Sequence, residues 1–75
     1  MADRDWEKLG WRHGPRPGLW CIHTERGSAT VEPAHWQWWA MVWGPELIAI
    51  AAEHDSESAA LTAASKALGL LEDEP

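Results

Sequence analysis

The sequence predicts an α+β fold: a three-stranded antiparallel sheet arranged as a meander, one C-terminal helix packed on one face, and an irregular N-terminal arm. Two observations predict this fold. Residues 19–52 are rich in β-branched and aromatic types separated by turn-forming residues, and the chain after His54 changes to alanine and leucine at helical spacing. The length of 75 residues and the hydrophobic content of 45% fit a single small folded domain.

The first 18 residues should form the arm. They contain a high density of residues that interrupt regular structure, namely Gly10, Gly14, Pro15, Pro17 and Gly18. Residues 3–9 could form one or two helical turns, but an isolated helix of this length is marginal in water. We therefore expect Trp6 and Trp11 to dock the arm on the rest of the domain.

The three expected strands follow one another along the chain. The first covers residues 19–24 and ends in a turn. The second extends over residues 28–43, interrupted at Pro33, so that it forms either one bent strand or two shorter ones. Gly44 and Pro45 then indicate a turn, and residues 47–52 form the third strand.

The last element should be a helix capped by Asp55 or Ser56. One apolar stripe runs along it at i, i+3, i+4 and i+7 spacing: Ala60, Leu61, Ala64, Ala67, Leu68 and Leu71. Thr62, Ser65 and Lys66 are expected on the opposite, polar side. The predicted βββα domain thus spans residues 19–71, and residues 72–75 form an acidic tail.

Alternation along the second strand divides its side chains between two faces. Trp36, Trp38, Ala40 and Val42 share the face expected to pack against the helix. Trp39, Met41 and Trp43 share the other face. There they either lie under the N-terminal arm or form an exposed apolar patch of the kind that marks a binding site.

Charge is distributed unevenly along the chain. Residues 1–26 hold four acidic and five basic side chains, a formal charge of +1, whereas residues 27–75 hold eight acidic side chains and one basic one, a formal charge of −7. Such a surface repels nucleic acids and anionic membranes and favours a basic protein partner. The longest apolar runs have six residues, too few to span a membrane.

No residue pattern points to catalysis, a metal or another cofactor. The single cysteine, Cys21, excludes an internal disulfide and a cysteine-based zinc site, and it fits a reducing cytoplasm. The four histidines lack the spacing of helical metal ligands and are expected to be structural or exposed. Cys21 and His23 share a strand face without a third group to orient them, so a small buried thiol is the expected role of Cys21.

Residues 19–71 resemble the three-strand-plus-helix layout of double-stranded-RNA-binding domains, whose last helix has an alanine-rich pattern similar to residues 59–68. That family places lysines at the start of this helix, where this chain has Asp55 to Ser58. RNA binding is therefore not implied. The size, acidic bias, Trp-rich strands and short Ala-rich helix also resemble small acidic phage and mobile-element proteins, among them anti-CRISPR inhibitors. This resemblance implies an RNA-guided nuclease complex as partner and the host cytoplasm as location.

We therefore expect a non-enzymatic inhibitor that binds a basic, nucleic-acid-binding surface of a partner protein, acting as a DNA mimic. The partner-binding residues would be acids that pair with Lys or Arg and indoles that add contact area: Glu32, Glu46, Glu53, Asp55, Glu57, Trp39 and Trp43. The alternative is a self-associating structural protein whose Trp39, Met41 and Trp43 pack against a second copy. The chain could accordingly be a monomer or a homodimer.

Overall fold

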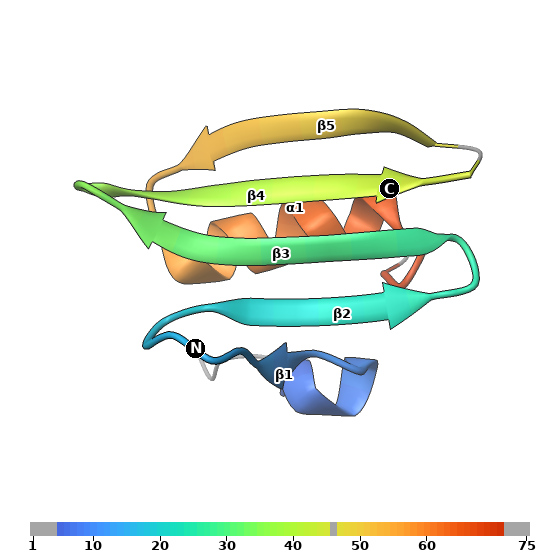
Figure 1. The fold of residues 1–75 in the computed structure, drawn as a ribbon, viewed down its shortest axis with the longest axis horizontal. Coiled ribbons are helices and arrows are strands. Elements are labelled where there is room, and N and C mark those ends of the chain that lie inside the picture. The colour runs from blue at the N-terminus through green and yellow to red at the C-terminus, as the bar shows by residue number, and fades with distance from the viewer. Residues whose placement is uncertain (1–4, 46, 72–75) are drawn as a thin grey trace.

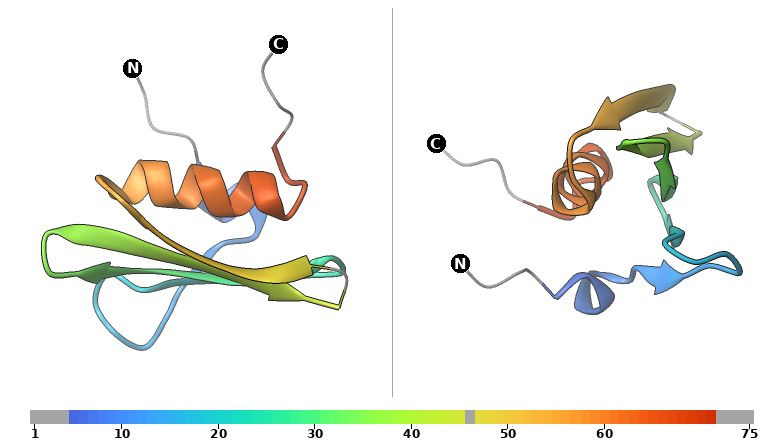
Figure 2. Two further views of the ribbon diagram at one scale, coloured as in Figure 1. Left: turned by 90° about the horizontal axis from the view of Figure 1, so that it is seen from above. Right: turned by 90° about the vertical axis from the view of Figure 1, so that its left-hand side faces the viewer.

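The computed structural model describes residues 5–45 and 47–71, with residues 47–50 described as backbone only. Its elements, in chain order, are η1 (Trp6–Leu9), β1 (Arg12–His13), β2 (Trp20–Thr24), β3 (Gly27–Ala34), β4 (Gln37–Gly44), β5 (Leu47–His54) and α1 (Glu57–Ala67). The strands form one antiparallel sheet in the order β1-β2-β3-β4-β5 (Figure 1). The helix α1 covers one face of this sheet, which makes a two-layer α+β fold (Figure 2).

The predicted number of strands, three, is wrong because the sheet has five. Residues 28–43 form a hairpin of β3 and β4, in which Ala34 pairs with Gln37 and the chain reverses at His35 and Trp36. His35 adopts a positive φ of 60°. Tight hairpin turns need positive φ and usually place glycine, asparagine or aspartate there, so a turn at His35 and Trp36 is hard to predict from the residue types.

Pro33 lies inside β3, opposite Trp38 of β4, and not at a break between strands. Pairing with β2 extends only as far as Val31, so among the described strands only β4 lies beside Pro33. A proline is tolerated at such a position because β3 has no β2 neighbour there, and the N–H that proline lacks is not needed for pairing on that side. The strand β1 was also not predicted. It lies in the arm that was expected to be irregular, and its residues Arg12 and His13 pair with Cys21 and Trp20 of β2.

The helix begins where its cap residues predict. Ser56 is the N-cap, and its Oγ accepts a hydrogen bond from the backbone N–H of Ala59 at 3.1 Å. The predicted apolar stripe is confirmed: Ala60, Leu61, Ala64 and Leu68 are buried, and Ala67 and Leu71 pack against them. The predicted acidic tail, residues 72–75, lies outside the described residues.

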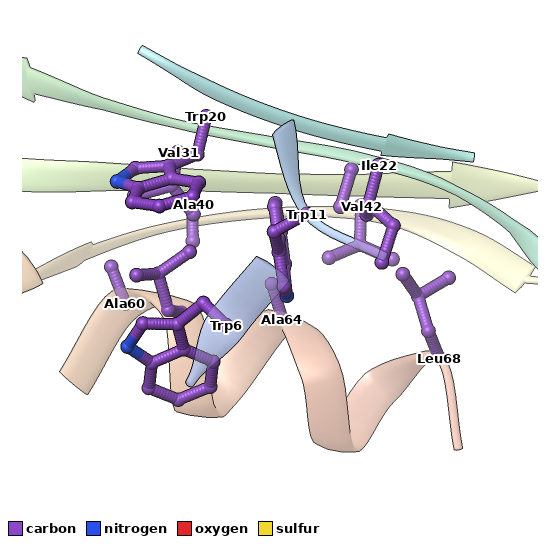
Figure 3. Close-up of a cluster of buried hydrophobic side chains, with 12 residues drawn as sticks. Trp6, Trp11, Trp20, Ile22, Val31, Ala40, Val42, Ala60, Ala64 and Leu68 are labelled. Carbon is purple, nitrogen blue, oxygen red and sulfur yellow. The ribbon is translucent and has the colours of Figure 1, made fainter. Parts of the chain in front are cut away.

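The core contains three tryptophans from the first part of the chain, Trp6, Trp11 and Trp20 (Figure 3). The expected docking of the arm through Trp6 and Trp11 is confirmed, since both are buried and Trp11 is fully so. The indole Nε1 of Trp11 donates to the Oγ of Ser65 at 2.9 Å, which ties the arm to α1. Ser65 is completely buried, so its predicted place on the polar side of the helix is wrong.

The two faces of β4 follow the predicted alternation except at its beginning. Ala40 and Val42 are buried under α1, and Trp38 packs against the core. Trp36 is 94% exposed, contrary to its predicted burial, because it belongs to the β3–β4 turn and not to the strand.

Candidate functional site

The sheet face opposite α1 carries the candidate site, and we call it the open face. Its side chains alternate along the strands with the buried ones, and α1 and η1 lie on the other side (Figure 2). In strand order, the described residues on this face are Arg12, Cys21, His23, Ser28, Thr30, Glu32, Ala34, Gln37, Trp39, Met41, Trp43, Ala51 and Glu53.

The open face holds an indole between two carboxylates, near the end of the sheet where β3 and β4 are joined. Trp39 of β4 pairs with Glu32 of β3 on one side and with Glu53 of β5 on the other. Directly opposed residues on neighbouring strands have Cβ atoms roughly 4.5 to 5.5 Å apart, so the three side chains are in reach of one another. We call these three residues the Trp39 row.

An apolar area lies next to the Trp39 row. Met41 and Trp43 are 46% and 41% exposed, the largest exposed hydrophobic side chains in the described sheet strands. Trp43 sits where the β4–β5 register shifts, between Val42 and Gly44. A Cβ atom at Gly44 would lie 2.4 Å from the carbonyl oxygen of Arg26, so only glycine allows the close approach that ends β4 here.

The β1–β2 loop borders the open face and supplies a cation. In Figure 2 this loop, coloured light blue, projects from the sheet on the side opposite α1. The Nη2 atom of Arg16 lies 2.6 Å from Oε2 of Glu32. Two backbone hydrogen bonds close the loop on itself, from the N–H of Gly14 to the carbonyl of Leu19 at 2.8 Å and from the N–H of Leu19 to the carbonyl of Arg16 at 3.1 Å. Arg16 therefore neutralises one of the two acids of the Trp39 row.

The other predicted acids lie elsewhere. Glu57 opens α1 on the covered side, where its Oε2 accepts a hydrogen bond from Nε1 of Trp20 at 3.1 Å. Asp55 is exposed in the connection between β5 and α1. Glu46 lies outside the described residues. The structure thus brings together Glu32, Glu53, Trp39 and Trp43 on one face, and it places Glu57 and Asp55 away from them.

Groups with catalytic potential are dispersed. Among residues 5–45 and 47–71, no three His, Cys, Asp or Glu side chains gather closely enough to hold a metal ion. Cys21 is partly exposed, contrary to its predicted burial. His23 Nδ1 lies 2.8 Å from Ser28 Oγ, a hydrogen-bonding contact with the neighbouring strand. His13 packs against Trp20, with ring centroids 4.0 Å apart.

Arg16 was not predicted to belong to the site. Nothing in its local sequence indicates the contact, because Arg16 and Glu32 are 16 positions apart and meet only when the loop folds over the sheet. The same holds for Trp20 and Glu57, which are 37 positions apart.

Comparisons with protein-family models, curated proteins and solved structures gave no match. None of the helices in the described part of the chain is long and apolar enough to cross a membrane.

Proposed function

We propose that this chain is a non-enzymatic binding protein whose open face docks on a basic surface of a partner protein, of the kind that otherwise holds nucleic acid. The observation that carries the proposal is the Trp39 row, an indole flanked on both sides by carboxylates on the uncovered face.

The chemistry of the Trp39 row suits an arginine of the partner. A guanidinium stacks on an indole face, and the same planar group donates paired hydrogen bonds to a carboxylate. Trp39 offers the aromatic surface, and Glu53 offers an exposed carboxylate beside it. Met41 and Trp43 supply apolar area that becomes desolvated at the centre of such an interface.

Arg16 supports this proposal from within the chain. Its guanidinium approaches Glu32 from the open-face side and remains 68% exposed, so Glu32 already accepts a cation from that direction. An arginine of the partner could exchange with Arg16 at little cost, because exposed ion pairs contribute only about 0 to 1 kcal/mol.

The net charge of −6 would accelerate the encounter with a basic surface. The described acids lie on both sides of the sheet, so the proposal rests on the Trp39 row and not on a continuous row of charges. An RNA-guided nuclease complex, the partner that the resemblance to anti-CRISPR inhibitors implies, would place the chain in the cytoplasm.

A binding titration with a short synthetic polyarginine peptide tests the proposal. Tryptophan fluorescence should report binding, and affinity should fall as salt rises from roughly 0.02 to 0.15 M because the attraction is screened. Glu53→Lys should weaken binding by roughly five- to tenfold, since it places a like charge beside Trp39.

Glu25→Lys is the matched control. Glu25 is exposed in the β2–β3 turn, so this variant changes net charge by the same amount without touching the Trp39 row. If both variants weaken binding equally, the peptide senses net charge alone and the proposal is wrong. Arg16→Ala should tighten binding, because it frees Glu32 for the peptide.

A second candidate is self-association through the open face, favoured by the half-exposed Met41 and Trp43. The two functions predict opposite changes of affinity when the salt concentration rises. Copies of a chain with charge −6 repel one another, so a homodimer should strengthen as salt rises, whereas binding to a basic partner should weaken. Sedimentation over a concentration series at two salt levels shows which behaviour holds.

A further inference from the structure

An apolar cavity of about 140 Å³ lies between α1 and strands β4 and β5, on the side of the sheet away from the proposed partner surface. Its described lining consists of five alanines, one valine and His54. Ala40 and Val42 project from the sheet toward the helix layer that carries Ala64 (Figure 3).

The cavity follows from the composition of the two layers. The sheet presents Ala40 and Ala52, and the helix presents Ala63, Ala64 and Ala67 opposite them. Small side chains on both sides leave space that a protein interior normally fills to the density of an organic crystal. An empty apolar cavity destabilises a fold roughly in proportion to its volume, so a molecule that occupies it would stabilise the chain.

One polar atom belongs to this lining. The Nε2 atom of His54 is buried and has no hydrogen-bond partner among the described residues. His54 is the last residue of β5 and pairs with Trp38, on the helix side of the sheet. Buried polar atoms nearly always have a partner, so this nitrogen is an available hydrogen-bonding position for a polar group of a ligand in the cavity.

The lining restricts the chemistry of that ligand. A neutral imidazole nitrogen is a donor in one tautomer and an acceptor in the other, and a hydroxyl group can pair with either. The remaining lining is alkyl, which disfavours a charged ligand. The volume suits one small ring, since apolar cavities of about 150 Å³ accept a benzene ring.

We infer that this cavity is a binding site for a small uncharged molecule with an apolar body and a single hydroxyl group, of the size of phenol, whose hydroxyl pairs with His54 Nε2. Ala63, Ala67 and His54 are each only partly buried, so the cavity wall reaches the protein surface, where a ligand can enter. The inference is independent of partner binding at the open face.

Titration of the full chain with phenol, followed by NMR of the alanine methyl groups, tests the inference. The methyl signals of Ala52, Ala63, Ala64 and Ala67 should shift and saturate together. Two variants fill the cavity from opposite walls, Ala63→Leu from α1 and Ala52→Val from β5, and each should reduce phenol affinity by at least tenfold, an amount typical of a steric block. Ala59→Leu is the matched control, because Ala59 is exposed on the same helix. This variant should bind phenol with the affinity of the parent chain.

The hydrogen bond to His54 is tested separately, by comparing the affinities of phenol and toluene. Phenol and toluene differ by a hydroxyl against a methyl group, so the ratio of their affinities isolates the hydrogen bond. That ratio should fall by about fivefold in His54→Leu relative to the parent chain, the worth of one hydrogen bond.

Three results would overturn the inference. The cavity is not a binding site if millimolar phenol leaves the four methyl signals unmoved, or if it binds both filled variants as well as it binds Ala59→Leu. An unchanged phenol-to-toluene ratio in His54→Leu would show that the imidazole does not select the hydroxyl.

Discussion

On the helix side of the sheet, Trp11 and Trp20 are buried and their indole N–H groups donate to Ser65 and Glu57, whereas on the open face Trp39 and Trp43 keep part of their surface in solvent. The same residue type therefore has two uses in one sheet. Strand alternation relative to α1 decides which use applies at each position. Stability should reside on the covered face and recognition on the open one, so substitutions on the two faces should separate the two properties.

The largest expected effect comes from truncating one tryptophan on each face. Trp11→Ala should destabilise the fold by about 3 to 5 kcal/mol, because it empties a fully buried site and removes the partner of Ser65. Trp43→Ala should cost about 1 kcal/mol or less, since the side chain is 41% exposed. Denaturant unfolding monitored by circular dichroism measures both, with Trp11→Phe as a milder variant. Equal losses at the two positions would refute the contrast between the faces.

A smaller effect is expected at the buried serine that joins the arm to the helix. Ser65→Ala should cost about 1 to 3 kcal/mol, because it leaves the N–H of Trp11 buried and without its partner. Ser58→Ala on the exposed side of α1 is the control and should change stability by less than about 0.5 kcal/mol. A Ser65→Ala variant as stable as its control would mean that the hydrogen bond adds nothing to the core.

The smallest effect compares two glutamates, one on each face. Glu57→Ala should cost about 1 kcal/mol, since it removes the acceptor of the Trp20 N–H and an acid from the first turn of α1. Glu53→Ala should leave the unfolding midpoint almost unchanged but weaken binding of the polyarginine peptide. If Glu53→Ala destabilises the fold more than Glu57→Ala does, Glu53 stabilises the folded chain and the contrast between the two faces is wrong.

Much of the covered side could be predicted from sequence, because periodicity records which face is buried. The helix and the burial of Ala40 and Val42 followed from local spacing, and the residue types limited the cap to Asp55 or Ser56, of which Ser56 is the N-cap. The hairpin between β3 and β4 did not, since its turn places a histidine and not a glycine at positive φ. The strand β1 was missed because two residues are too few to show alternation.

The candidate site was predictable only in part. Alternation placed Trp39 and Trp43 on one face, and pairing in the folded sheet then added Glu32 and Glu53. The separation of Glu57 and the pairing of Arg16 with Glu32 depend on contacts between segments far apart in the chain. The order of charged residues along the sequence does not show which acids form ion pairs or hydrogen bonds in the folded chain.

The hydrogen bond from Trp11 to Ser65 spans 54 positions and so joins the earliest and latest described parts of the fold. During translation Trp11 is synthesised before Ser65, so its indole can be buried against α1 only after the helix has been synthesised. Contacts between such distant segments slow folding, because the ends of a long loop must meet before the contact stabilises them.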